Sequence, residues 1–230
     1  QLMDAAVEAP EGYYLAAWKS GSNSYIPGGT AEIKGDLNLT ADYQPITYSI
    51  TYDGLEDATF GGDQTNPNPE SYTIEDSIEI VNPERSGYEF IGWSSSTSPD
   101  MNMNYSIDKM FGDIELTANW MKNCTVSFDG NGATLPSDIF ADVHTHVGDS
   151  VKIPLQEPTR TGFAFCGWSV NAASTIVDYY PDQELQADDD TTLYAIWALE
   201  YYNIDYVGAG DLYEPDYISF TVNDTITINN

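Results

Sequence analysis

The sequence predicts a mostly β protein (α+β at most) made of small tandem modules of about 75 residues, with short strands and little helix, forming an elongated array. Three observations support this prediction. A tryptophan motif recurs at constant spacing, several segments alternate apolar and polar residues, and Tyr is the dominant aromatic, with 17 copies in 230 residues. Alternation is typical of strands buried on one face, and aromatic residues favour strands.

The repeat is defined by three short motifs that occur in the same order. The first is GYEFIGW at 87–93, which returns as GFAFCGW at 162–168 and more loosely as GYYLAAW at 12–18. The other two motifs also have three copies each, at 39–43, 116–120 and 193–197 and at 74–80, 147–153 and 222–228. A fixed order of recurring motifs is the signature of a repeat architecture.

The repeat divides the chain into four predicted parts. These are the C-terminal part of a repeat (1–44), two complete repeats (45–121 and 122–198) and the N-terminal part of a repeat (199–230). An alternative frame gives three units, 10–82, 83–157 and 158–230. In the first frame the two partial repeats together have about the length of one repeat. We therefore hypothesise that they become ordered only by pairing, within or between chains.

The individual strands follow from the period of the apolar residues. Tyr48, Ile50 and Tyr52 alternate with polar residues, and the same pattern recurs at 124–128 and 202–206. Leu116, Ala118 and Trp120 share one face of the predicted last strand of a repeat. The sequence leaves room for one short helix per repeat, at 105–110 and 179–185.

The charge of the chain excludes two classes of partner. Seven basic residues against 37 acidic residues give a net charge of −30, which repels nucleic acid and anionic membranes. No apolar run reaches transmembrane length, and the first residues do not form a signal peptide. We expect the chain to be a piece of a larger protein, with any export signal and anchor outside it.

Residues 123–197 carry the full pattern of a known family. An alternating strand ends in FDGNG, then come PTRTGFAFCGW and, at the end, DTTLYAIW. This pattern resembles the Listeria–Bacteroides repeat, which is related to the internalin B-repeat. The resemblance implies small β-grasp-like modules in extracellular bacterial surface proteins, used as stalks or for adhesion. It brings no catalytic residues.

The recurring aromatic and glycine residues form the predicted structural core of the modules. A carbohydrate-stacking platform is the alternative for the tryptophans, but their constant phase favours a core role because small modules need bulky aromatics. The glycines are interpreted as bends, bulges or tight packing points. The predicted core motif comprises Trp18, Trp93, Trp120, Trp168, Trp197, Phe90, Phe163, Phe165, Gly87 and Gly162.

The stretch SFDGNGAT at 127–134 could be a calcium loop or a turn. Its Asp and Asn are not kept in the other copies, where Val207, Leu55 and Ala209 stand instead. A glycine after an alternating strand does persist. We predict a chain reversal in which Asn131 and Gly132 supply positive φ angles.

Two other groups are candidates for metal binding. Asp188, Asp189 and Asp190 are hard oxygen ligands that suit calcium, but a turn that caps the next strand is favoured, with Asp113 and Asp36 matching Asp190 in the other copies. His144 and His146 form a conceivable metal pair, disfavoured because the other copies have Ser or Thr there. No metal or other cofactor is therefore expected, with calcium as the weak alternative.

Two cysteines are too few for a disulfide scaffold. Cys124 and Cys166 replace apolar residues of the other copies, so buried free thiols are expected, with a disulfide between them as the alternative.

The predicted function is a non-enzymatic spacer or stalk in a bacterial cell-surface protein, whose partners are the neighbouring repeats. The alternative is an adhesion module for a host protein or glycan, for which Tyr179, Tyr180, Tyr213 and Tyr217 are the candidate contact residues. An enzyme is disfavoured because a catalytic constellation should be unique, whereas almost every feature here recurs.

Overall fold

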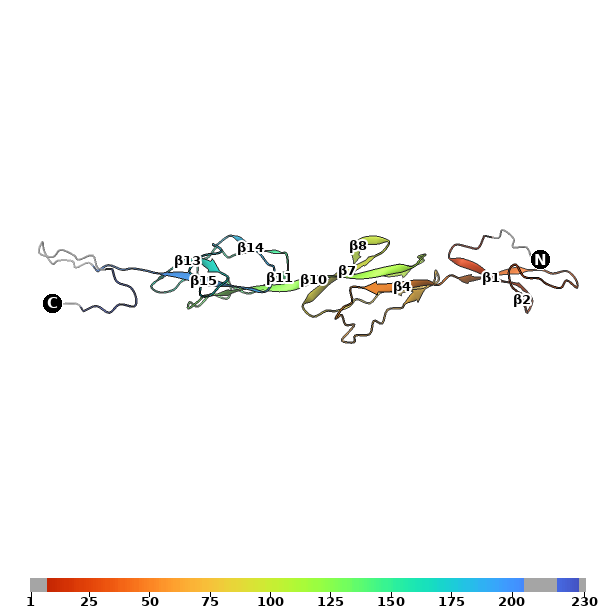
Figure 1. The fold of residues 1–230 in the computed structure, drawn as a ribbon, viewed down its shortest axis with the longest axis horizontal. Helices are drawn as coiled ribbons and strands as arrows, with labels where there is room; N and C mark the ends of the chain where they lie inside the picture. The colour runs from red at the N-terminus through yellow and green to blue at the C-terminus, as the bar shows by residue number, and fades with distance from the viewer. Residues whose placement is uncertain (1–7, 205–218, 228–230) are drawn as a thin grey trace. The chain divides into compact units, whose positions relative to one another are not determined.

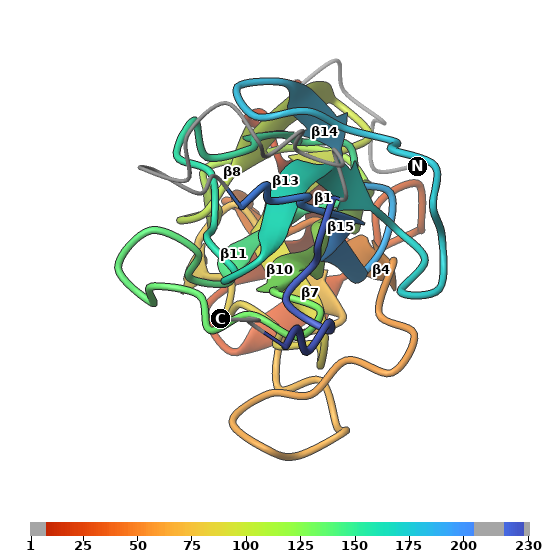
Figure 2. The same cartoon turned by 90° about the vertical axis from the view of Figure 1, so that its left-hand side faces the viewer.

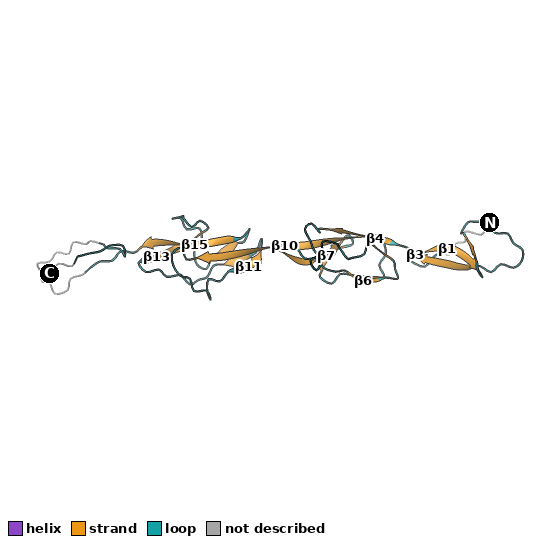
Figure 3. Cartoon of the chain, turned by 90° about the horizontal axis from the view of Figure 1, so that it is seen from below, coloured by secondary structure: helices purple, strands orange, loops and turns teal. Residues whose placement is uncertain are grey.

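A computed structural model describes residues 8–204 and 219–227 (Figure 1). The described residues form strands and loops with no helix, as Figure 3 shows. The two segments with room for a short helix instead contain strands β9 (Ser106–Asp108) and β14 (Glu184–Gln186), so the helix prediction was wrong there. Both short strands place one apolar side chain, Ile107 or Leu185, into a core between polar neighbours, which is a period-2 pattern.

The chain divides into two compact units, 1–121 and 122–230, which we describe separately. The boundary coincides with the predicted junction of the two complete repeats. One strand, β10 (Ile114–Asp129), contributes its first part to the first unit and its later part to the second. The assignment of the end segments as separate parts of repeats stays a prediction.

The first unit contains the N-terminal partial repeat and the first complete repeat. The partial repeat forms a three-stranded antiparallel sheet in the order β2-β1-β3. In the complete repeat the order is β5-β4-β10-β7-β8, with β4 and β10 parallel. A two-strand ladder, β6-β9, lies outside this sheet. The strands are β1 (Tyr13–Ser20), β2 (Asn23–Tyr25), β3 (Thr40–Pro45), β4 (Tyr48–Asp53), β5 (Ser71–Tyr72), β6 (Ser77–Glu79), β7 (Tyr88–Ser95), β8 (Ser98–Asn102) and β9.

The second unit repeats this topology. Its sheet order is β11-β10-β15-β13, with β10 and β15 parallel and the other pairs antiparallel. β12 and β14 form the separate ladder. Figures 1 and 2 both place β13 beside β15. The strands are β11 (Val143–His146), β12 (Ser150–Lys152), β13 (Phe163–Ser169), β14 and β15 (Thr191–Leu199).

The alternating sequences form the strands that they predict. Tyr48, Ile50 and Tyr52 lie on β4, and Cys124, Val126 and Phe128 lie on β10, where Cys124 and Val126 are buried. The third predicted copy, 202–206, is described only to residue 204, and there Tyr202 forms an isolated bridge with Phe220.

Each complete repeat has a core of its own around one fully buried tryptophan. In the first repeat Trp93 is packed with Ile50, Tyr72 and Leu116, and in the second Trp168 is packed with Val126 and other buried residues. The aromatic contacts recur as well: the ring centroids of Phe90 and Trp93 are 5.6 Å apart, and those of Phe165 and Trp168 are 5.3 Å apart. Edge-on aromatic packing of this kind adds about 0.5–1.5 kcal/mol per pair beyond area burial.

Candidate functional site

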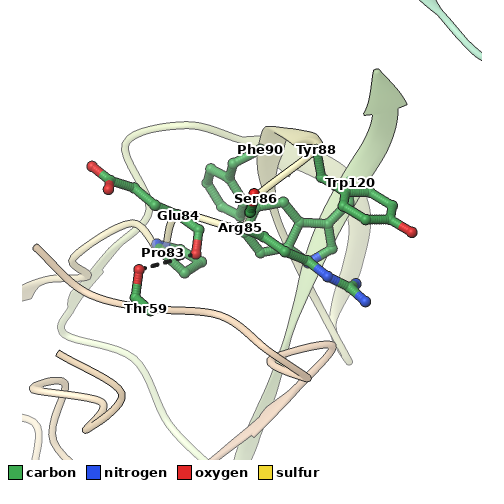
Figure 4. Close-up of a pocket in the computed structure, with 8 residues that line it drawn as sticks. All are labelled: Thr59, Pro83, Glu84, Arg85, Ser86, Tyr88, Phe90 and Trp120. Carbon is green, nitrogen blue, oxygen red and sulfur yellow. Dashed lines mark hydrogen bonds between the residues drawn. The ribbon is translucent and has the colours of Figure 1, made fainter. Parts of the chain in front are cut away.

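Both complete repeats carry a pocket at the same position, where the Pro-x-Arg segment meets the strand of the glycine–aromatic motif. In the first repeat it measures about 410 Å³. The lining residues are Thr59, Pro83, Glu84, Arg85, Ser86, Tyr88, Phe90 and Trp120 (Figure 4). In the second repeat it measures about 670 Å³ and includes the matching residues Pro158, Arg160, Phe163 and Phe165. We call these two the arginine pockets.

An arginine lies flat on an aromatic ring in each pocket. The Arg85 guanidinium carbon is 4.2 Å from the centre of the Tyr88 ring, and that of Arg160 is 4.0 Å from the centre of Phe163. Figure 4 shows the Arg85 side chain extending along Tyr88 and Trp120. Such cation–π contacts contribute about 0.5–1 kcal/mol at exposed sites. The arginines therefore cover aromatic faces that a sugar could otherwise stack on.

The two arginines, the only ones in the chain, have no carboxylate partner in the part of the chain that the structure describes. Arg160 donates from Nη1 to the backbone oxygen of Asn131 at 3.3 Å, and neither guanidinium belongs to an ion pair there. Several N–H groups thus remain available to a ligand in each pocket. Glu84 lines the first pocket and Glu157 and Glu200 the second, so donors and acceptors are both present. This mixture suits hydroxyl-rich ligands better than free anions.

The SFDGNGAT stretch is a turn, as predicted. Asn131 and Gly132 have φ angles of 46° and 98°, and the Ala133 N–H donates to the Gly130 carbonyl at 3.1 Å. The Asp129 carboxylate accepts the Asn131 N–H at 2.7 Å, so it serves the turn itself. The Asn131 amide donates to the backbone oxygens of Ala172 and Ala195, which anchors the turn to two other segments.

The acidic run before β15 has structural partners. Asp190 Oδ1 accepts the Thr125 N–H at 2.8 Å, and Asp113 Oδ1 accepts the Ser49 N–H at the same distance in the first repeat. Asp189 forms an ion pair with Lys122 at 3.1 Å. Asp113 and Asp190 thus each fix the entry of a parallel strand pair, in agreement with the favoured interpretation of Asp190. Within 8–204 and 219–227, no three His, Cys, Asp or Glu side chains gather as metal ligands.

The histidines and cysteines are also placed by local contacts. His144 Nδ1 is 3.1 Å from Thr125 Oγ1, and His146 Nδ1 is 3.4 Å from Asp149 Oδ2. Both cysteines are free thiols. Cys124 belongs to the core of the second repeat, and burial raises the pKa of its thiol. Cys166 is only partly buried and occupies the β-bulge between Phe165 and Gly167 on β13, so the expectation of burial fits Cys124 better.

The predicted core motif residues differ in burial between copies. Trp93 and Trp168 are fully buried, whereas Trp18 in the partial repeat is partly exposed. Trp120, Trp197, Phe90 and Phe165 pack against the two cores from partly buried positions. Phe163 is partly buried beneath Arg160. Gly87 and Gly162 have φ angles of 77° and 78°, in the turns that precede β7 and β13.

The tyrosines proposed as adhesion contacts fall into two groups. Tyr179 packs against the core of the second repeat, and Tyr180 is 55% exposed. Tyr213 and Tyr217 lie outside the described residues. The arginine pockets were not singled out from the sequence, although both arginines of the chain occupy the same repeat position, which is a signal that sequence reasoning could have used.

Together, two similar β units with matching cores and matching pockets define a tandem β-repeat protein. The model of the Listeria-Bacteroides repeat domain matches residues 48–119 and 125–196, which is more than half of the chain. The chain therefore belongs to the Listeria–Bacteroides repeat family.

Two curated relatives come from Evansella cellulosilytica. A "Putative Gly-rich membrane protein" is 27% identical over 207 residues, covering 87% of this chain and 22% of the relative. A "Putative membrane protein" is 26% identical over 178 residues, covering 76% of this chain and 25% of the relative. The chain thus spans about a quarter of the length of these relatives. No solved structure matches, so the β-grasp likeness stays a prediction. The described residues contain no helix, and therefore no helix that is long and apolar enough to cross a membrane.

Proposed function

We propose that the chain is a non-enzymatic spacer within a larger protein of the bacterial cell surface. The observation that carries this proposal is the recurrence of the same structural contacts in both complete repeats. Each repeat has its own aromatic core, its own strand-entry aspartate and its own indole bond to a glycine carbonyl, from Trp120 to Gly54 and from Trp197 to Gly130. A module that is stable by itself and can be added in series is what a spacer requires.

The names of the relatives support a location at the cell envelope. Both are called putative membrane proteins, and this chain matches only about a quarter of each. The net charge of −30 would keep tandem repeats soluble and would oppose collapse of one repeat on another. We infer an extracellular location, with membrane attachment supplied by other parts of the parent protein.

Small-angle X-ray scattering tests the spacer proposal. A compact chain of this length has a radius of gyration of about 17 Å. We expect a clearly larger value and a pair-distance distribution with a long tail, retained at low and high salt. A compact, near-spherical particle at both salt concentrations would overturn the proposal.

The arginine pockets support adhesion to a glycan as a second candidate function. Their recurrence in both repeats, with free guanidinium N–H groups beside carboxylates, would allow a repeated low-affinity interaction whose strength grows with the number of repeats. A glycan array probed with the full chain tests this. Arg85→Ala with Arg160→Ala should remove the signal, while Lys34→Ala, which changes the same type of charge at an exposed ion pair with Glu32, should not.

A signal that survives the double arginine substitution would exclude the pockets as the binding site. Thermal unfolding of each variant is needed beside the array, because Arg160 also supports the Asn131 turn.

A further inference from the structure

The third recurring motif of the chain begins with a turn that is built in the same way in two repeats. In the first complete repeat, Asp76 Oδ2 accepts the N–H and the hydroxyl of Thr73 at 2.7 and 2.8 Å. In the C-terminal partial repeat, Asp224 Oδ2 accepts the N–H and the hydroxyl of Thr221 at 2.7 and 2.9 Å. The residues that follow the two threonines are both β-branched and apolar, Ile74 and Val222. Each turn thus fixes the position of one aliphatic residue.

These two aliphatic side chains do not belong to the cores of the complete repeats. Ile74 is partly buried and Val222 is 45% exposed, and among the described residues neither is part of the two core clusters. Ile78 and Ile80, the next apolar residues of the same motif, do belong to the core of the first complete repeat. Packing within a core therefore does not explain why the residue after the threonine is aliphatic in both copies.

Each aliphatic side chain instead packs against a glycine of the preceding repeat. A Cβ atom added to Gly12 would lie 2.9 Å from Ile74 Cδ1, and one added to Gly162 would overlap the methyl groups of Val222. Both glycines are buried and have positive φ angles, 82° and 78°. Glycine suits these positions for two reasons, since it adopts a positive φ without strain and leaves room for close approach.

A backbone hydrogen bond accompanies each of these contacts. The Ile46 N–H donates to the Gly12 carbonyl at 2.8 Å, and the Glu200 N–H donates to the Gly162 carbonyl at 3.0 Å. Ile46 and Glu200 occupy the same position in the repeat, in the connection that leads from one repeat into the next. The same pair of interactions, one through the backbone and one through an aliphatic side chain, therefore occurs at two connections.

We propose that these contacts form an interface between consecutive repeats, the glycine–aliphatic joint, made of Gly12 with Ile74 and of Gly162 with Val222. Its partner is the following repeat of the same chain, recognised through a β-branched side chain that packs on glycine backbone. In the first unit a bond of 2.9 Å from the Tyr13 hydroxyl to Glu75 Oε1 adds to the joint. The joint limits motion about the connection between two repeats. The third motif thus connects repeats in addition to folding them, which goes beyond the spacer role.

Amide hydrogen exchange, measured by NMR on the full chain, tests the joint of the first unit. Ile74→Asp should accelerate exchange of the Ile46 N–H about fivefold or more, because a charged side chain does not pack on buried glycine backbone. Ile74→Val introduces the residue type found at position 222 and should keep this rate within about twofold of the unchanged chain. The Ile80 N–H, which donates to the Tyr105 carbonyl within the complete repeat, reports whether that repeat stays folded and should exchange at its original rate.

A matched pair of variants tests the joint of the second unit. Val222→Asp and Asn223→Asp add the same charge to neighbouring exposed residues, and Val222 is the one that packs against Gly162. Val222→Asp should accelerate exchange of the Glu200 N–H about fivefold or more, and Asn223→Asp less than about twofold. The Ile153 N–H, which is hydrogen-bonded inside the second complete repeat, should be unaffected by both substitutions.

Three results would overturn the proposal. The first is unchanged exchange of the Ile46 and Glu200 amides in the Ile74→Asp and Val222→Asp chains, and the second is equal acceleration by Val222→Asp and Asn223→Asp. The third is acceleration of the Ile80 N–H as strong as that of the Ile46 N–H in the Ile74→Asp chain, which would place Ile74 in the fold of its own repeat. None of these results bears on the spacer proposal, whose test is the scattering profile.

Discussion

In the first complete repeat the Trp93 indole donates to Asn82 Oδ1 at 3.1 Å, whereas in the second the buried indole nitrogen of Trp168 has no hydrogen-bond partner among the described residues. The difference lies in the segment before the Pro-x-Arg motif, where two residues separate Ile80 from Pro83 but four separate Ile153 from Pro158. Counted back from the proline, the exposed Glu157 stands where the first repeat has Asn82. Trp93 and Trp168 are both fully buried, so the two repeats bury the same ring but satisfy its polar atom differently.

The hydrogen bonds that are present in both repeats each have a backbone group as one partner. Trp120 and Trp197 donate to glycine carbonyls at 2.8 and 2.9 Å, and the strand-entry aspartates accept backbone N–H groups. A backbone acceptor does not depend on which side chain is present, so such contacts survive sequence divergence between repeats. The contact of Trp93 needs a particular side chain, and the second repeat has lost the equivalent.

The largest expected effect is the loss of a buried tryptophan. Trp93→Ala or Trp168→Ala should cost about 3–5 kcal/mol in the free energy of unfolding of its own repeat. Trp18→Ala should cost less because Trp18 is partly exposed. Hydrogen exchange measured by mass spectrometry would show which repeat opens in each variant.

The contrast between repeats would break down if Trp168→Ala exposed the amides of both repeats equally. Equal destabilisation by all three substitutions would contradict the burial difference between the partial and complete repeats.

The next largest effect is the loss of the hydrogen bond between the Trp93 indole and Asn82. Asn82→Ala should destabilise the first repeat by about 1–3 kcal/mol, because it leaves the Trp93 N–H buried without a partner. Asn82→Asp keeps an acceptor for the indole but loses the bond from Asn82 Nδ2 to the Met103 carbonyl, so it separates the two contributions.

Substitution at the corresponding position of the second repeat should raise the free energy of unfolding of that repeat. Glu157→Asn replaces this exposed carboxylate with the side chain that serves Trp93, at the position matched from the proline, and should stabilise the second repeat by about 1 kcal/mol. Chemical denaturation of both variants would measure these changes, with Gln156→Asn as the neighbouring control. A neutral result for Glu157→Asn, beside a destabilising Asn82→Ala, would show that the second repeat positions this residue differently.

Period and recurrence predicted most of the fold from the sequence. Strands such as β4 were predictable because their apolar residues alternate over several residues, and the core followed from tryptophans at a constant phase. The helix assignments failed at β9 and β14, where three-residue strands are too short for a period to be recognised.

The arginine pockets and the indole contacts were not predictable in the same way. They join residues far apart in the chain, such as Arg160 with Asn131 and Trp197 with Gly130, and their geometry depends on the packed sheet. The turn at Asn131 was predictable because Asn-Gly favours positive φ angles. Its counterpart in the first repeat reaches a φ of 58° at Asp57 with no such signal.

The smallest expected effect is the response of matching turn aspartates to acid. Asp76 Oδ2 accepts bonds from the Thr73 hydroxyl and N–H, and Asp149 Oδ2 accepts bonds from the Thr145 hydroxyl and the His146 N–H. These hydrogen bonds lower the pKa of both carboxyls, and attraction to His146 contributes further at Asp149. The stabilisation is therefore present above the unfolded pKa, near ~3.9, and is lost as the pH falls through the folded value.

Asp76→Asn and Asp149→Asn should each make the unfolding temperature less dependent on pH below ~4. Differential scanning calorimetry from pH 7 to pH 2 measures this, with Glu56→Gln as a control that removes one exposed charge. His146→Ala should move the acid loss of the second repeat to higher pH, because it removes one cause of the lowered pKa of Asp149 without adding a hydroxyl like that of Thr73. If His146→Ala left that loss unchanged, the hydrogen bonds from Thr145 and the backbone would account for the whole shift, and the two turns would be equivalent despite their different sequences.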